Sequence, residues 1–153
     1  MGSEMCIRDS KNSVLIVYAN NETSKANLFE EIKHRGVDPS RLIFGDSLPK
    51  PKYLARYKTA DLFLDTHPYN AGTTASDALK MGLPMITYLG NCYQARMGAS
   101  IVSALNLPEL ITHSLEEYEA LAIELATNPE KMQAIKDKLA TVSYTHLTLP
   151  TKA

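Results

Sequence analysis

This chain of 153 residues has no tryptophan, only two cysteines and no long hydrophobic run. Two cysteines, Cys6 and Cys92, cannot build a disulfide framework, which predicts a reducing, cytoplasmic setting. A helix that crosses a membrane needs about 18 or more apolar residues in succession, and their absence predicts no membrane partner. The 16 basic and 17 acidic residues leave no positive excess for a nucleic-acid partner.

The remaining composition is that of a globular domain. Hydrophobic residues make up 44% of the chain, which is enough for one domain of this length to bury a sizeable core. Seven glycines and eight prolines occur without a low-complexity tract, so the composition excludes a largely disordered chain.

The two ends of the chain do not show the patterns of a folded segment. Residues 1–10 and 142–153 have no strand or helix periodicity and no secretory signal. Residues 5–10 can be encoded by ATG TGT ATA AGA GAC AGT, whose reverse complement encodes Thr-Val-Ser-Tyr-Thr-His, the sequence of residues 141–146. Such an inverted DNA repeat is similar to the transposon-end adapters of sequencing libraries. We therefore expect residues 1–10 and 142–153 to be adapter-derived, and residues 11–141 to be a native fragment of a longer protein.

Residues 11–141 alternate between strand and helix patterns. Short apolar runs predict strands at residues 14–18, 41–45, 61–65, 84–88 and 107–111. Amphipathic or capped segments predict helices at residues 24–35, 53–58, 73–81, 93–105, 114–126 and 129–140, with Ser24 capping the first. Strands separated by helices favour right-handed crossovers. The sequence therefore predicts an α/β fold with a Rossmann-like parallel sheet and flanking helices.

Ligands of such folds bind at the carboxyl ends of the strands, and the connection after residues 61–65 is the most informative. It places Gly72, Thr73 and Thr74 at a helix start, where free amides, two hydroxyls and the helix dipole favour a phosphate. Asp77, one turn later, could face the same side and accept hydrogen bonds from sugar hydroxyls. The alternative is plain capping by Thr73 or Thr74, with Asp77 stabilising the helix dipole.

A resemblance to a known family is carried by the segment LFLDTHPYNAGTTASDALKMGLPMITYLGNCYQARMGASIV. This segment is similar to the C-terminal catalytic half of the protein O-linked N-acetylglucosamine transferases, which include SPINDLY-type proteins and bacterial members with TPR repeats. The resemblance covers nearly all of residues 11–140. It implies the C-terminal, donor-binding half of a GT-B glycosyltransferase, a fold that binds a nucleotide sugar without an obligatory metal or other cofactor.

The same resemblance implies roles for residues around the Gly-Thr-Thr segment. Thr73 and Thr74 match the pair that contacts the donor phosphates, and Asp77 matches the carboxylate that binds the ribose. Gly72 replaces a histidine of animal members, which leaves only its backbone amide for the phosphate.

Three residues upstream also match donor-binding positions. Lys50 falls where the family has a lysine near the donor base and phosphates, and Arg56 matches an arginine that lines the nucleotide site. Tyr53 falls where better-known members have a histidine that stacks on uracil, which leaves the identity of the base open. No catalytic residue and no metal ligand is assigned.

The resemblance implies transfer of N-acetylglucosamine from UDP-N-acetylglucosamine to Ser or Thr hydroxyls of an acceptor protein, with inversion. The N-terminal catalytic half and any TPR repeats are expected in the parent protein, so we expect the isolated chain to be inactive. Two alternatives stay open: GDP-fucose as the donor, and a non-catalytic Rossmann-like nucleotide-binding module. A dinucleotide oxidoreductase is less favoured, because no G-x-G-x-x-G follows residues 14–18.

Two further charged residues have structural interpretations. Asp65 ends a predicted strand, and we expect it to cap the following turn rather than to act in catalysis. Arg96 has three interpretations: a contact to phosphate, an ion pair with Asp65, or a solvated side chain.

Overall fold

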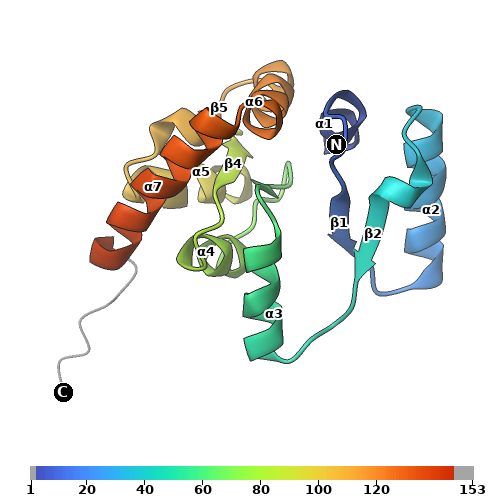
Figure 1. Ribbon diagram of the computed structural model, residues 1–153, viewed down its shortest axis with the longest axis horizontal. Coiled ribbons are helices and arrows are strands. Elements are labelled where there is room, and N and C mark those ends of the chain that lie inside the picture. Colours follow the sequence, from blue (N-terminus) through green and yellow to red (C-terminus); the bar gives the residue numbers. More distant parts are fainter. Residues whose placement is uncertain (1–2, 147–153) are drawn as a thin grey trace.

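The computed structural model describes residues 3–146, in which strands and helices alternate along the chain (Figure 1). The strands are β1 (Leu15–Tyr18), β2 (Leu42–Gly45), β3 (Phe63–Leu64), β4 (Met85–Tyr88) and β5 (Ile111–Thr112). The α-helices are α1 (Ser3–Asp9), α2 (Glu22–His34), α3 (Lys50–Arg56), α4 (Thr73–Lys80), α5 (Met97–Ala104), α6 (Leu115–Thr127) and α7 (Pro129–His146). Short 3-10 helices are η1 (Pro39–Arg41), η2 (Tyr57–Thr59), η3 (Gln94–Arg96) and η4 (Pro108–Leu110). The predicted α/β fold class is confirmed.

The strands form two parallel sheets, which corrects the expectation of one continuous sheet. Strand β1 pairs with β2, with Leu15 opposite Leu42, and the second sheet has the order β3-β4-β5. In the part of the chain that the structure describes, β1 and β3 are not paired with each other. The alternation of patterns predicts crossovers, but it does not determine which strands become neighbours.

The main core surrounds β4. Met85, Ile86 and Thr87 are fully buried, as expected for a central strand of a parallel sheet that is covered on both faces. Helices α4, α5, α6 and α7 contribute Leu79, Val102, Leu125 and Leu139 to the same cluster. No helix between residues 3 and 146 has both the length and the apolar character that crossing a membrane requires.

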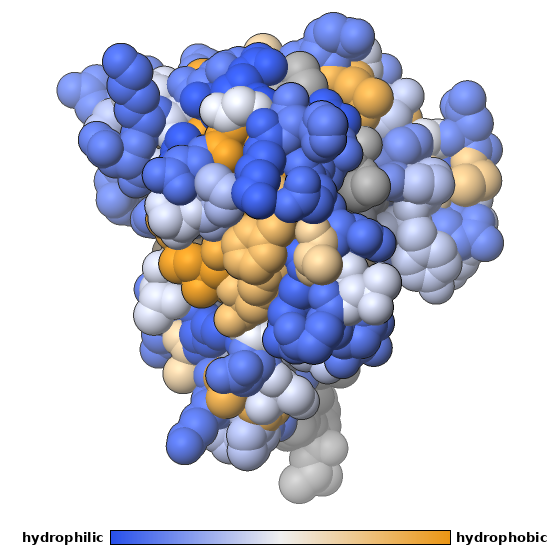
Figure 2. All heavy atoms as spheres, turned by 90° about the vertical axis from the view of Figure 1, so that its right-hand side faces the viewer, coloured by the Kyte–Doolittle hydropathy of each residue, from blue (hydrophilic) through white to orange (hydrophobic). Residues whose placement is uncertain are grey.

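A second, smaller core joins α2 to the β1–β2 pair. It consists of Ile7, Ile32, Val37 and Leu42. Burial alternates between half-buried and exposed along β1, so this strand presents an exposed face that includes Ile16. Figure 2 views the side of the molecule on which α2 and β2 lie, and it shows hydrophobic side chains between hydrophilic ones.

Two helix starts show how side chains satisfy the first backbone amides. Helix α2 begins after Asn21, whose side chain accepts a hydrogen bond from the Ser24 amide at 2.7 Å. The expectation that Ser24 caps this helix is therefore wrong; Asn21 offers a similar acceptor three residues earlier. Helix α6 begins as expected, because Ser114 Oγ accepts from the Glu117 amide at 3.1 Å.

The segments that the sequence assigns to adapters are partly described. Residues 3–9 form α1, in which Cys6 and Ile7 are buried, and helix α7 extends to His146. Residues 147–153 lie outside the described residues. The adapter origin of residues 1–10 and 142–153 stays a prediction, since a short helix can form on either origin.

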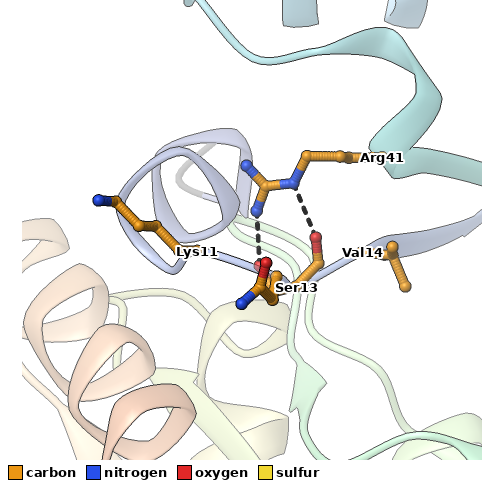
Figure 3. Close-up of a pocket in the computed structure, with 5 residues that line it drawn as sticks. Lys11, Ser13, Val14 and Arg41 are labelled. Atoms are coloured by element: carbon orange, nitrogen blue, oxygen red, sulfur yellow. Dashed lines mark hydrogen bonds between the residues drawn. The ribbon is translucent and has the colours of Figure 1, made fainter.

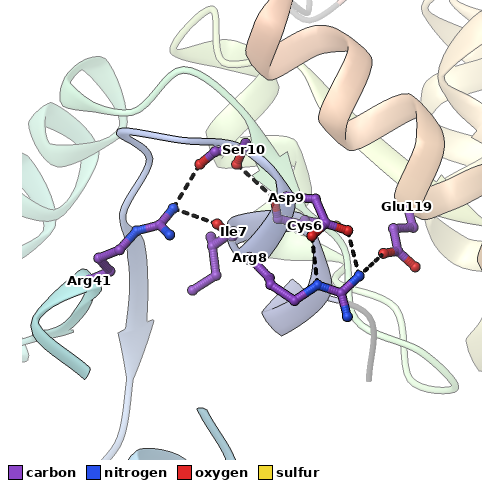
Figure 4. A network of polar contacts seen from close by, with 7 residues as sticks. All are labelled: Cys6, Ile7, Arg8, Asp9, Ser10, Arg41 and Glu119. Atoms are coloured by element: carbon purple, nitrogen blue, oxygen red, sulfur yellow. Dashed lines mark hydrogen bonds and ion pairs between the residues drawn. The ribbon is translucent and has the colours of Figure 1, made fainter. Parts of the chain in front are cut away.

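Arg41 holds the turn between α1 and β1 against the start of β2. Its guanidinium donates hydrogen bonds to the carbonyl of Ser13 at 2.8 Å (Figure 3) and to the carbonyls of Ile7 and Ser10 (Figure 4). The last carbonyls of a helix lack partners within the helix. A half-buried cation therefore satisfies the end of α1 and ties it to residues far along the chain.

We expect Arg41→Met to lower the free energy of unfolding by about 2 kcal/mol, because these carbonyls lose a charged donor while the aliphatic stem is kept. Urea unfolding measures this loss. The matched control is Lys33→Met, which removes an exposed ion pair with Glu30 and is expected to cost no more than about 0.5 kcal/mol. Equal losses in the two variants would contradict the anchoring role.

Candidate functional site

The start of α4 leaves its first backbone amides without a side-chain cap. The cap residue is Gly72, and no side chain accepts a hydrogen bond there. Thr73 and Thr74 lie inside the helix and are exposed. The alternative that one of these threonines caps the helix is therefore not observed. The amides and the positive end of the helix dipole remain available to an anion.

Asp77 connects α4 to α3 through an ion pair. Its carboxylate accepts from the ammonium group of Lys50, the first residue of α3. The Asp77 side chain is 14% exposed and that of Lys50 is 58% exposed, so the carboxylate is the more sheltered partner. The structure thus places Asp77, which lies in the middle of α4, opposite an exposed cation.

Tyr53 lies between two cations on α3. The Lys50 Nζ atom is 5.0 Å from the centre of its ring, and the Arg56 guanidinium carbon is 5.9 Å from it. Its hydroxyl lies 2.5 Å from that of Tyr57, and burial raises the pKa of the Tyr57 hydroxyl, with a further contribution from this hydrogen bond. Tyr57 is a residue that the sequence analysis missed; its spacing of one helical turn from Tyr53 is the signal that could have found it.

Arg56 is positioned by the loop that follows β2. Its guanidinium donates to the carbonyl of Asp46 at 2.9 Å. A Cβ atom at Gly45 would lie 2.8 Å from Arg56 Nη1, so the glycine at the end of β2 leaves the space that this guanidinium occupies. We call the seven residues that the sequence predicts here the α3–α4 cluster: Lys50, Tyr53, Arg56, Gly72, Thr73, Thr74 and Asp77.

The loop that leads into α4 is organised by the buried carboxylate of Asp65. One of its oxygens accepts from the amides of Thr66 at 3.0 Å and Ala71 at 2.7 Å, and the other accepts from the Thr87 hydroxyl at 2.7 Å. Asp65 therefore caps the turn, as expected. It forms no ion pair with Arg96, which instead donates to the carbonyl of Gly90. Burial raises the pKa of the Asp65 carboxyl, although its three hydrogen bonds act in the opposite direction.

Two neighbours complete the Asp65 network. The side chain of Asn70 donates to the carbonyl of Thr66 at 2.8 Å and accepts from the Gly98 amide at 3.3 Å. A Cβ atom at Gly98 would lie 2.2 Å from an Asp65 oxygen, so α5 can approach only because this residue is glycine. Asn70 is a second residue that sequence analysis missed, because its partner on α5 is distant in the chain.

The elements around the α3–α4 cluster define what the site can do chemically. Cations come from α3, and uncapped amides, two hydroxyls and a carboxylate come from α4. A Cβ atom at Gly72 would meet only Met97, at 4.0 Å, so a side chain at this position would also fit. Among the side chains that the structure describes, residues 6–142, no group of three His, Cys, Asp or Glu could hold a metal ion.

Comparisons with known proteins agree on one family. The family model described as glycosyl transferase family 41 matches residues 4–152. A Caenorhabditis elegans protein named UDP-N-acetylglucosamine–peptide N-acetylglucosaminyltransferase is 34% identical over 69% of this chain, and a probable enzyme of the same kind, SEC of Arabidopsis thaliana, is 40% identical over 69%. The chain spans only 9% and 11% of these two relatives.

A solved structure shows the same fold. It is a mutant of an O-GlcNAc transferase from Thermobaculum terrenum, which matches 95% of this chain with a TM-score of 0.87 and 26% sequence identity. This chain covers 29% of that chain. The likeness extends through both sheets, since it includes nearly all of the residues described.

Asp65→Ala should lower the free energy of unfolding by about 3 kcal/mol, because it leaves two amides and a hydroxyl without their acceptor. Asp65→Asn should cost less than about 1 kcal/mol, because an amide can accept from both backbone groups and donate to the Thr87 oxygen. Urea unfolding at neutral pH compares the two. Similar losses for both would show that the network does not hold the loop.

The Asp65 carboxyl also predicts a dependence on pH. Its pKa is raised in the folded state, so the folded chain holds this proton more tightly than the unfolded chain does. The stability of the wild type, relative to Asp65→Asn, should therefore fall as the pH rises from the ordinary aspartate pKa near 4 through the raised value. A constant difference between the two proteins across pH 4 to 7 would contradict this assignment.

Proposed function

The chain belongs to glycosyl transferase family 41, and on this premise we propose that its α3–α4 cluster binds the nucleoside diphosphate of a sugar donor. The observation that carries the proposal is the ion pair between Lys50 and Asp77, which lies beside the uncapped start of α4. Cations from α3, and hydroxyls and a carboxylate from α4, are available there. A sugar nucleotide presents the matching groups: a charged diphosphate, a ribose and a base.

The diphosphate is assigned to the start of α4. Backbone amides, the hydroxyls of Thr73 and Thr74 and the helix dipole all favour a negative charge at this point. Lys50 is exposed and its long side chain can turn from Asp77 to a phosphate oxygen. When the bond to the sugar breaks, negative charge develops on the departing diphosphate, and these groups stabilise it electrostatically.

The ribose and the base are assigned to the other groups of the cluster. Asp77 accepts hydrogen bonds from the ribose hydroxyls once Lys50 has moved to the phosphate. The ring of Tyr53 offers a surface on which the base stacks, and its hydroxyl is held by Tyr57. Arg56, fixed by the carbonyl of Asp46, closes the edge of the site.

The donor is proposed to be UDP-N-acetylglucosamine, and the acceptor a Ser or Thr hydroxyl of a protein, because the relatives are named for that donor and a peptide acceptor. The reaction is a direct displacement at the anomeric carbon with inversion, and it needs no metal ion. The acceptor-binding half and any TPR repeats belong to the parent protein, for which we also propose a cytoplasmic location. GDP-fucose is the alternative donor, because the ring of Tyr53 can stack on guanine as well as on uracil.

Isothermal titration of the chain with UDP tests the site. Thr74→Val and Asp77→Ala should each weaken UDP binding by about tenfold, because each removes a hydrogen bond to a charged or buried group. Asp61→Ala is the matched control, because that carboxylate is exposed and pairs with Lys136 at 3.0 Å; it should leave the affinity unchanged. If all three variants bind UDP as the wild type does, the α3–α4 cluster is not the site.

Competition between UDP and GDP identifies the base. We expect UDP to displace GDP, since the relatives are named for a UDP-sugar donor. A preference for GDP would instead support the fucose donor while keeping the site assignment.

Transfer of sugar by the chain alone is not expected. A radiolabelled donor incubated with the chain and a Ser/Thr-containing peptide should yield no labelled peptide, because the acceptor site is proposed to lie in the parent protein. Labelling above the level of an Asp77→Ala control would overturn this expectation.

A further inference from the structure

The ammonium group of Lys50 covers two groups of the α3–α4 cluster at the same time. It forms an ion pair with the carboxylate of Asp77, and it lies 5.0 Å from the centre of the Tyr53 ring. The helices that carry these residues, α3 and α4, lie side by side (Figure 1). Under the proposed function, Asp77 accepts from the ribose and the Tyr53 ring stacks on the base. One cation therefore stands on both surfaces that a nucleoside needs.

The Asp77 carboxylate depends on this single cation. Among the described residues, the Lys50 ammonium is its one hydrogen-bond donor and its one ion-pair partner, although the Asp77 side chain is only 14% exposed. A sheltered carboxylate that loses its partner regains little hydration. A ligand that separates the pair must therefore offer a donor to Asp77 and an anion to the ammonium group.

A nucleoside and its diphosphate differ in what they offer to Lys50. The ribose hydroxyls of either ligand can donate to Asp77, but a neutral nucleoside has no anion for the displaced ammonium group. A diphosphate at the uncapped start of α4 supplies that anion. Lys50 is 58% exposed and carries a long side chain, so its ammonium group can turn toward the phosphates. The same cation thus opposes the nucleoside and favours the diphosphate.

We propose that Lys50 is a specificity-determining residue, through which the α3–α4 cluster selects nucleoside diphosphates against nucleosides that lack phosphate. We call its contacts with Asp77 and Tyr53 the Lys50 latch, and the phosphates open this latch by attracting the ammonium group. The inference rests on the proposed function, because it requires the nucleotide to bind at this cluster. It goes beyond a phosphate contact, because a lysine that only attracts phosphate would leave nucleoside binding unchanged.

Titration of the full 153-residue chain with UDP and with uridine, followed by protein NMR, tests the latch. Lys50→Met keeps an unbranched side chain of similar length and removes the charge. We expect it to weaken UDP binding by about tenfold, because a charged contact to phosphate is lost. It should tighten uridine binding by about threefold to fivefold, because an exposed ion pair and a cation–π contact no longer oppose the nucleoside. GDP and guanosine replace these ligands if competition identifies guanine as the base.

Two further variants separate the latch from a general effect of charge. Lys50→Arg keeps the cation and should retain the selectivity for UDP over uridine. Lys52→Met is the matched control, since Lys52 is an exposed residue of α3 that forms no ion pair with any described residue; it should leave both affinities within about twofold. Circular dichroism checks that all variants are folded.

Salt provides an independent measurement on the unaltered chain. Screening weakens the exposed ion pair, so uridine should bind more tightly as NaCl rises from about 50 mM to about 500 mM. Uridine is neutral, and its binding to Lys50→Met should therefore not change with salt. The affinity for UDP should fall over the same range, because its charged contacts are screened.

Three results would overturn the proposal: uridine binds Lys50→Met no better than it binds the wild type, Lys52→Met has the same effect as Lys50→Met, or salt does not tighten uridine binding to the wild type. If Lys50→Met weakens UDP binding and leaves uridine binding unchanged, the proposed donor site stands and the latch does not. If the wild type binds no UDP, both proposals are wrong.

Discussion

The carboxylate of Asp65 is the contact on which the site depends. It stands at the end of β3 and holds three donors, from the following loop and from β4. The carbonyl of the same residue accepts from the Tyr118 hydroxyl at 2.9 Å, so α6 is joined to the same point. A buried carboxylate with one donor removed would carry a large desolvation cost. The Asp65 carboxylate therefore stabilises the loop before α4 and, through the Ala71 amide, the position of the uncapped start of α4.

The candidate donor site combines a fixed half with an adjustable half. The α4 half is fixed by the main core, since Ala75, Ala78 and Leu79 of this helix are fully buried. The α3 half is more exposed and carries the long side chains of Lys50 and Arg56. This division suits a proposed nucleotide site, in which preorganised amides receive the diphosphate and the exposed ammonium group of Lys50 closes on it. The Lys50–Asp77 ion pair keeps both charges partnered when no ligand is present.

The two sheets are separate because β1 and β3 are not paired with each other in the described part of the chain. The backbone groups of a strand are satisfied by neighbours at its edges, and the apolar side chains of parallel strands are buried by elements that cover both faces of the sheet. In the described part of the chain, β4 has a partner on each side and its residues Met85, Ile86 and Thr87 are fully buried, whereas β1 has one partner and exposed apolar side chains. The exposed hydrophobic residues Ile16 and Tyr18 thus lie on a strand that has one edge without a neighbouring strand among the described residues.

The sequence by itself determined the local features of this protein. Hydrophobic runs and turn residues predicted β1 to β4, most helices and the Gly-Thr-Thr start of α4, because these depend on neighbours within a few positions. The strand predicted at residues 107–111 was wrong for most of its length, since Pro108–Leu110 form the 3-10 helix η4 and β5 is Ile111–Thr112. The family resemblance followed from the same segment, and it predicted a group of site residues of which the fold brings Lys50 and Asp77 into contact; their role in donor binding stays a prediction. The sequence analysis predicted Ser24 as the cap of α2, whereas Asn21 caps it, because both side chains offer an oxygen near the same helix start. Only the tertiary structure decided the Lys50–Asp77 pair, the contacts of Tyr57 and Asn70, and the division into two sheets. Each of these depends on which elements become neighbours in space, and that is decided by packing over the whole chain rather than by local pattern.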